Sequence, residues 1–362
     1  MAVISKGLSQ ITKYIVFLAV VIGGGVFVYN NMPPENQGAE RSSLYHKDQA
    51  TDSLVRLLGL TGIRVQGDTL APEPNWPEAK LTLSSRSLEE ITQAIQGKKN
   101  PKISWFIKGE RWETKGLEYL TLTSDQIRAI LDLIFKKLEF GPAVLPKQHK
   151  YEGVLFLGST LKSVRDRLNF INTYLARHHL SYNKFYILTG PRPLDPAVGE
   201  TPESLLDPKG IIEIRPDWQK PAGQLPTNEN AMVRWVFDQS RSDALPKEQI
   251  EIIYAGIDEE RKRATTQTTI EAWLRTNPKD GLYLAVSSQP FNLYQKLVIE
   301  HTLLENKRPG IRIEVIGNAA DERHYDLNKT NSGDLNKYTA VALDNIARIC
   351  YELVAIQRLS KG

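Results

Sequence analysis

The sequence predicts an α/β protein: a Rossmann-like, doubly wound parallel sheet, preceded by an N-terminal transmembrane helix and a small α+β module. Three observations lead to this prediction. After Tyr151, short apolar segments alternate with segments of helical period, the texture of buried parallel strands separated by helices. An apolar run without charge lies near the N-terminus. The stretch between this run and Tyr151 mixes helix-like and strand-like segments. We therefore divide the chain into a cytoplasmic N-terminus (1–13), a transmembrane anchor (14–32), a linker (33–43), the α+β module (44–150) and the Rossmann-like domain (151–362).

The composition is that of a globular protein with a sizeable core: 41% of the 362 residues are hydrophobic and 24% are charged. The net charge of +4 is small, and Lys and Arg are interspersed with Asp and Glu, so we expect no nucleic-acid partner. The single cysteine, Cys350, lies in a helical pattern and is expected to be a buried thiol. The six histidines show no metal-binding spacing, so we predict no metal site, and the cofactor remains unknown.

The membrane anchor is predicted from hydropathy and flanking charge. Ile15 to Val28 is almost continuously apolar, and Tyr14 to Met32 is close to the ~20 residues that cross a bilayer. Lys6 and Lys13 precede this run and Glu35 follows it, which places the N-terminus in the cytoplasm. In a bacterium the chain would be a single-pass inner-membrane protein with its main domain in the periplasm. A cleaved signal peptide is the alternative, although no small-x-small cleavage site follows the run.

The segment from 44 to 150 contains two predicted helix starts. Ser87 to Glu90 and Thr123 to Gln126 both have the pattern of a capping box that opens an amphipathic helix. Ile103 to Ile107, with the sequence ISWFI, is expected to form a short strand. The segment contains no motif that indicates a function.

Strands and helices are predicted to alternate in the last domain. The strands are expected at 153–157, 185–188, 211–214, 250–255, 282–286 and 311–316, and the helices at 161–176, 228–239, 266–276, 291–304 and 334–359. In such sheets ligands bind beyond the carboxyl ends of the strands, at helix N-termini.

Four of these strand ends carry glycine or small hydroxyl residues, and arginines lie close to two of them. Backbone N–H groups, hydroxyls and guanidinium groups together suit an anionic ligand, most simply a phosphate. At any one position, however, Ser or Thr at a helix start is commonly just an N-cap. The candidate ligand-binding residues are Gly158, Ser159, Arg165, Thr189, Gly190, Arg192, Thr266, Thr268, Thr269, Ser287 and Ser288. The glycine-rich patterns of conventional nucleotide sites are absent from the sequence.

Taken in order, these turns resemble the motifs of the YdcF-like (SanA/ElyC-type) superfamily of unknown function. That pattern consists of a glycine turn with an arginine in the next helix, a Ser-Gly-Gly strand end, a helix bearing a glutamate, a Ser-x-Asn-Thr-x-Glu-Asn helix start, and a Thr-Ser-x-x-His-x-x-Arg strand end. The matching positions here are Gly158 and Arg165, then Thr189 to Pro191, then Glu229, then Thr269 and Glu271 within Thr266 to Ala272, and finally Ser287 and Ser288.

The chain departs from that pattern at several positions, so we regard it as a divergent member. Phe291 stands where the family has its histidine, and Tyr294 stands where it has its arginine. Pro191 replaces the second glycine, and Ala272 replaces the closing asparagine. Loss of the histidine and arginine removes an acid–base group and an anion clamp.

The resemblance implies a membrane-anchored periplasmic protein of cell-envelope biogenesis or maintenance that binds a phosphate-bearing or sugar-linked ligand. One alternative is a degenerate, non-catalytic scaffold subunit of a membrane-associated complex, with other envelope proteins as the possible partners. Another is a hydrolase or transferase acting on a phosphorylated envelope intermediate, with Glu229 or Glu271 as the catalytic candidates. The sequence leaves open whether the protein is an enzyme.

Overall fold

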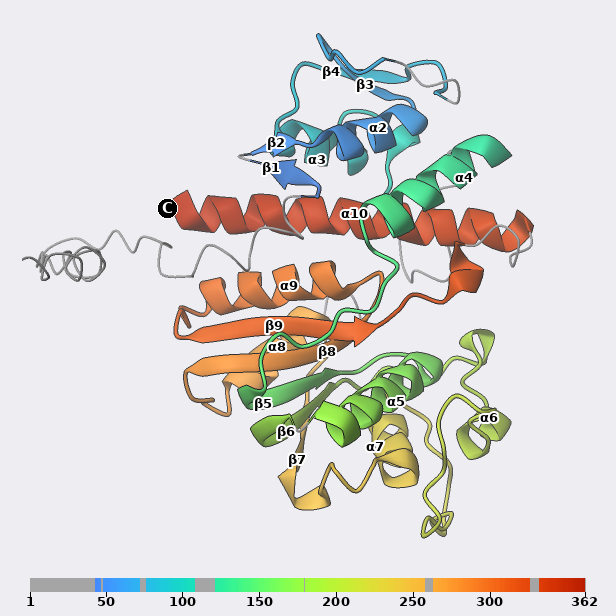
Figure 1. Ribbon diagram of the computed structural model, residues 1–362, viewed down its shortest axis with the longest axis vertical. Coiled ribbons are helices and arrows are strands. Elements are labelled where there is room, and N and C mark those ends of the chain that lie inside the picture. Colours follow the sequence, from blue (N-terminus) through green and yellow to red (C-terminus); the bar gives the residue numbers. More distant parts are fainter. Residues whose placement is uncertain are drawn as a thin grey trace, which may run out of the picture. The chain divides into compact units, whose positions relative to one another are not determined.

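The computed structural model describes residues 43–46, 48–71, 76–107, 121–178, 180–257, 263–325 and 332–361 (Figure 1). All of them belong to one compact unit, residues 37–362. Within these ranges, no helix combines the length and apolar character needed to cross a membrane. The predicted anchor lies outside the described residues, as do residues 1–13 and most of the predicted linker.

A five-stranded parallel sheet forms the centre of the C-terminal part. Its strand order is β7-β6-β5-β8-β9, which confirms the predicted Rossmann-like α/β architecture. The chain starts in the middle at β5, builds outward on one side, and then crosses to the other side with β8. The order therefore reverses between β5 and β8, the switch point at which doubly wound sheets bind their ligands. The strands are β5 (Lys150–Leu157), β6 (Ser181–Thr189), β7 (Ile250–Tyr254), β8 (Gly281–Ser288) and β9 (Ile311–Asn318).

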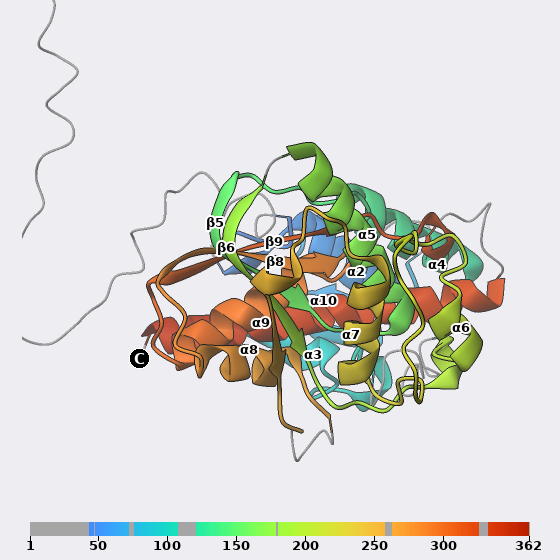
Figure 2. The same cartoon turned by 90° about the horizontal axis from the view of Figure 1, so that it is seen from below.

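Helices cover both faces of this sheet. Helices α5 (Leu161–His178) and α7 (Glu229–Ser240) pack on one face, and α8 (Thr266–Leu274) and α9 (Asn292–Glu305) pack on the other (Figure 2). Side chains alternate along each strand. Phe156 of β5 therefore enters the core under α5 and α7, while the next residue, Leu157, enters the core under α8 and α9.

The predicted strand at Ile211 to Ile214 is wrong. The long connection from β6 to α7 contains only a 3-10 helix (Pro196–Val198) and the short helix α6 (Pro202–Leu206). Ile212 is buried in the core, which explains its apolar character, but the segment pairs with no strand. It lies between Gly210, whose φ is 75°, and Pro216, which are both unfavourable residues inside a strand.

The segment before the sheet combines short strands with helices. Its strands form two two-stranded sheets, β1 with β2 and β3 with β4. The elements are β1 (Tyr45–His46), β2 (Gln49–Ala50), α2 (Asp52–Leu60), β3 (Ile63–Val65), β4 (Leu81–Leu83), α3 (Leu88–Ile95), a 3-10 helix (Pro101–Ile103), α4 (Ser124–Asp132) and a π-helical turn (Leu133–Lys137).

Of the two predicted capping boxes, one is confirmed in full. Thr123 and Gln126 cap each other's backbone at the start of α4. Ser87 accepts a hydrogen bond from the Glu90 N–H at the start of α3, but the Glu90 carboxylate binds Ser84 and Ser85 instead of closing the box.

The predicted strand at Ile103 to Ile107 is also wrong. Ile103 closes the 3-10 helix, and the extended residues after it find partners outside any sheet. Trp105 donates its N–H to the Ile95 carbonyl at the end of α3, and Ile107 donates to the Asp344 carboxylate. The apolar side chains are buried, but no neighbouring strand is available to them.

The final helix, α10 (Ser332–Lys361), joins the two parts of this unit. It packs on α9 and also on α3 and α4 of the N-terminal segment (Figure 1). The core of that segment therefore includes side chains from α9 and α10, so it draws on residues on both sides of position 150. Cys350 lies fully buried in this core, as predicted, and burial raises the pKa of its thiol to about 12.

A largely buried ion pair links α9 to α10. His301 Nδ1 lies 2.7 Å from Glu352 Oε2, and His301 Nε2 lies 3.5 Å from Glu305 Oε1. The hydrogen bond to Glu352 raises the pKa of His301, against the opposing effect of burial, and the charge of Glu305 adds to the rise.

This ion pair predicts a pH-dependent contribution to stability. Because the folded-state pKa of His301 is raised, its contribution is complete below the unfolded value of about 6.5 and is lost as the pH rises through the folded value. The free energy of unfolding of the wild type, minus that of His301→Gln, should therefore be constant below about pH 6.5 and fall as the pH rises above it. Denaturant titrations at several pH values measure this difference. A difference that stays constant with pH would contradict the assignment. In a Glu352→Gln background, the difference caused by His301→Gln should depend less on pH.

Candidate functional site

The carboxyl ends of β5 and β8 meet at the switch point of the sheet. There β5 runs into Gly158, Ser159 and Thr160, which are half-buried, and α5 begins directly after them. β8 ends in Ser287 and Ser288, which are both buried. The side chain that connects the two strand ends is one that the sequence prediction did not select, Arg167 of α5.

Arg167 donates hydrogen bonds to both strand ends. One terminal nitrogen donates to the Leu157 carbonyl at 2.7 Å and the Gly158 carbonyl at 3.1 Å, and the other donates to the Ser288 hydroxyl at 3.2 Å. Its Nε is buried without a partner. The residue is only 4% exposed, and burial lowers the pKa of its guanidinium to about 10. In the part of the chain that is described, no carboxylate lies within ion-pair distance of this cation, although Glu229 and Asp166 act on it from further away.

Arg165, the predicted site arginine, lies elsewhere. Its guanidinium donates to the Ser204 and Leu205 carbonyls and to the Gln239 side chain, so it fastens the β6–α7 connection to α5 and α7. Residues two apart on a helix do not face the same way. Only one of Arg165 and Arg167 can therefore reach the strand ends.

A buried cluster of alternating charge lies beside the end of β6. Arg192 donates to both oxygens of Glu200 at 2.8 Å and to Glu229 Oε2 at 3.2 Å. Thr189, fully buried at the end of β6, donates its hydroxyl to Glu229 Oε1 at 3.3 Å. The predicted residues Thr189, Arg192 and Glu229 are thus brought together, and Glu200 joins them.

Gly158 makes room for this cluster. A Cβ at Gly158 would lie 2.2 Å from Glu229 Oε1 and 2.9 Å from the Leu188 carbonyl oxygen. Gly190 plays a similar part on the other side, since a Cβ there would lie 2.2 Å from the Cβ of Ala264 before α8. Both predicted glycines therefore serve close approach of neighbouring chain segments.

The two carboxylates of the cluster differ in their environment. Burial raises the pKa of Glu229, and the contacts from Arg192 and Thr189 oppose that rise without cancelling it. Burial also acts to lower the pKa of Arg192, but the hydrogen bonds to Glu200 and the charge of Glu229 outweigh it and raise the value. Because its distances are shorter, Glu200 is the main counter-charge of Arg192, and Glu229 is the weaker partner.

Glu200 also occupies the start of α5. It accepts a hydrogen bond from the Leu161 N–H at 3.0 Å and another from the Asp195 N–H at 2.8 Å. A carboxylate of the chain itself thus satisfies a helix N-terminus that would otherwise attract an anion. Sequence reasoning missed Glu200 because it lies in the irregular β6–α7 connection, which has no periodic pattern to show its direction.

The threonines at the start of α8 are held by local hydrogen bonds. Thr265 is the N-cap and forms a reciprocal capping box with Thr268, while Thr269 donates to the Thr266 carbonyl. Thr266 donates its hydroxyl to Gln295 of α9. These contacts explain the residues without a ligand.

The second catalytic candidate, Glu271, lies in the middle of α8, where it accepts a hydrogen bond from Gln267. It does not contact the cluster around Glu229 through any hydrogen bond within the described ranges. Glu229 is therefore the only one of the two candidates that the structure brings to the strand ends.

The two serines that end β8 face opposite sides of the sheet. Ser288 meets Arg167, whereas Ser287 is fully buried with an unpartnered hydroxyl. Asn292, at the start of α9, is likewise buried, and both polar atoms of its amide lack a partner. Tyr294, at the position of the family arginine, takes part in a hydrogen bond with Arg348 of α10.

Comparison with known proteins gives no family assignment: no protein-family model, no curated protein and no solved structure matches this chain. The YdcF-like resemblance thus remains a prediction from the order of the motifs. Among the described residues, no group of three histidine, cysteine or acidic side chains is arranged to hold a metal ion.

The close approach at Gly158 gives a direct test of the site geometry. Gly158→Ala places a methyl group against a carboxylate and a backbone carbonyl, so we expect a loss of about 1 to 3 kcal/mol in the free energy of unfolding. Gly256→Ala is the matched control, because a Cβ at Gly256 meets nothing within 4 Å. Denaturant titration of the two variants measures the difference. Equal stability of the two variants would show that Glu229 does not lie against Gly158.

Proposed function

We propose that this chain is a membrane-anchored, periplasm-facing protein of cell-envelope biogenesis or maintenance, which binds the anionic group of a phosphate-bearing or sugar-linked ligand at the carboxyl ends of β5 and β8. One observation carries the proposal: the buried Arg167 guanidinium bridges the carboxyl ends of β5 and β8, where its hydrogen-bond partners are all neutral oxygens. A buried charge costs several kcal/mol unless an opposite charge or strong hydrogen bonds compensate it.

The chemistry around Arg167 favours a phosphate oxygen as the missing partner. Guanidinium groups bind phosphate through two parallel N–H donors, and Ser288 can add a hydroxyl donor. Gly158, Ser159 and Thr160, which follow β5, are half-buried and have small side chains, so they would leave room for a ligand. Because Glu200 already fills the start of α5, we place the anion on the β8 side of the switch point.

A catalytic role would rest on Glu229. Its raised pKa suits a proton donor or acceptor, but both carboxylate oxygens are already engaged, one by Thr189 and one by Arg192. Binding without catalysis is therefore the simpler proposal, and a hydrolase or transferase activity is the less favoured one.

A scaffold function is the second candidate, and Tyr294 favours it. This side chain interacts with Arg348 and so helps to hold α10, instead of supplying a charge to the strand ends. As a scaffold, the domain would use the surface at the carboxyl ends of β5 and β8 to bind other envelope proteins, and it would need no ligand.

Phosphate binding can be tested by thermal unfolding of the full chain in detergent micelles. Inorganic phosphate and glycerol phosphate are added to the wild type, Arg167→Lys, Arg167→Met and the surface control Arg275→Gln. A ligand at one hundred times its Kd adds about 2.7 kcal/mol of stability. We expect stabilisation of the wild type and of Arg275→Gln, weaker stabilisation of Arg167→Lys, and none of Arg167→Met.

Two outcomes would overturn this proposal. Stabilisation that persists in Arg167→Met would place the anion elsewhere. No stabilisation of the wild type by either phosphate compound would remove the ligand and leave the scaffold as the better account. The Arg167→Lys variant keeps the test valid if Arg167→Met fails to fold, since it retains the charge and loses only the forked geometry.

The predicted anchor is tested separately by fractionation. The full chain should remain with bacterial membranes after a high-salt wash, and a version without residues 1–36 should not. A C-terminal tag should be cut by protease added to cells whose outer membrane has been opened. Recovery of a shortened, soluble periplasmic form from the full-length gene would instead identify residues 14–32 as a cleaved signal peptide.

A further inference from the structure

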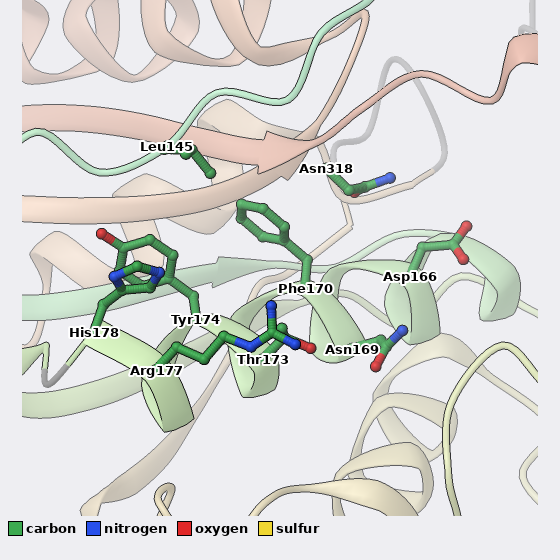
Figure 3. A pocket seen from close by; sticks show the side chains of 9 residues that line it. All are labelled: Leu145, Asp166, Asn169, Phe170, Thr173, Tyr174, Arg177, His178 and Asn318. Carbon is green, nitrogen blue, oxygen red and sulfur yellow. The ribbon is translucent and has the colours of Figure 1, made fainter.

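A groove of about 480 Å³ runs along α5, away from the strand-end site. Its other walls come from Leu145, in the segment that leads into β5, and from Asn318, at the end of β9 (Figure 3). Leu145 is 55% exposed, which is unusual for a large apolar side chain. None of the candidate site residues at the ends of β5, β6 and β8 lines this groove.

Two rows of side chains follow α5 along the groove. Phe170, Tyr174 and His178 form a row of rings spaced four residues apart, and the rings of Tyr174 and His178 stack at 4.3 Å. Residues at this spacing share one face of a helix. Figure 3 shows these rings directed from α5 toward the neighbouring strand.

The second row is polar: Asn169, Thr173 and Arg177 precede the three rings by one residue each. In the described parts of the chain these three side chains make no hydrogen bond or ion pair. A solvated helix face would also leave them without partners. The opposite wall of the groove favours a bound ligand over solvent alone, because the Asn318 amide oxygen is buried there without a partner.

We propose that this groove binds a short saccharide chain. Sugar rings present flat C–H faces that pack on aromatic rings, and they carry hydroxyls at their edges that both donate and accept hydrogen bonds. Phe170 and His178 supply the first kind of contact, since Tyr174 is buried and stacked against His178, and the amide, hydroxyl and guanidinium row supplies the second. Pockets that combine an apolar floor with a few well-placed polar groups are the usual form of small-ligand sites.

The charges at the groove favour a ligand without net charge. Asp166 lies at one end, paired with Lys162 at 2.8 Å, and Arg177 lies at the other. Glu314, whose charge acts on Tyr174, adds a negative charge, and its carboxylate accepts hydrogen bonds from the Lys147 backbone N–H and the Tyr151 hydroxyl. Since the two signs are balanced along the groove, hydrogen bonding and stacking would determine affinity.

The test uses the full chain in detergent micelles with two neutral probes, chitotetraose and maltotetraose. Saturation-transfer NMR detects contact with the sugar, and calorimetric titration gives the Kd. We expect saturable binding of at least one probe. Asn169→Ala should weaken it about fivefold, the effect of losing one neutral hydrogen bond, and Phe170→Leu should weaken it while keeping an apolar side chain. Arg275→Gln is the matched surface control, and Arg177→Gln should weaken binding where that control does not.

This proposal can fail independently of the phosphate site. Phosphate stabilisation of Asn169→Ala should equal that of the wild type, because the groove and the strand-end site share no side chain. Absence of saturable binding to both saccharides, or binding that the three groove variants leave unchanged, would overturn it. Binding of an acidic or apolar test peptide without binding of either sugar would also overturn it and would mark the groove as a peptide site.

Discussion

Helix α9 is packed on two sides, and most of the architecture follows from this constraint. Its inner side lies on β8 and β9, where Ile299 and Leu303 enter the core of the sheet. Its outer side presents Leu293 and Leu297 to α10 and to the N-terminal segment. A helix that presents apolar side chains on two sides is stable only when both sides are covered. The N-terminal segment, α10 and the sheet therefore share one continuous set of contacts.

This packing also limits what the end of β8 can do. Tyr294, one turn into α9, is drawn into the contact with Arg348, and the Asp344 carboxylate binds both Arg348 and the Ile107 N–H. Tyr294 thus contributes to the α9–α10 interface. At this end of the sheet, Ser288 and its hydrogen-bond donor Arg167 are the side chains that could still contact a ligand.

The sequence predicted the sheet well because its signals are local. Apolar runs and helical periods recorded the burial of each strand and helix, and the Thr123 cap could be recognised from four residues. The failures depended on long-range partners. Ile212 is apolar because it reaches the core from an irregular segment, and ISWFI lies against α3 and α10 rather than beside another strand. Patterns of burial cannot distinguish these cases from strands.

Sequence patterns were likewise insufficient at the candidate site, and its three arginines show why. Arg165 is satisfied by carbonyls of the β6–α7 connection, and Arg192 is satisfied by Glu200 and Glu229. Both therefore hold the protein's own segments in place. Arg167 differs in position, because its partners are the ends of the two central strands. From sequence, an arginine near a glycine turn could have any of these roles. For the two arginines of α5, the direction of the side chain distinguishes them: Arg165 holds the β6–α7 connection, whereas Arg167 lies at the ends of β5 and β8, where we propose that it receives an anion.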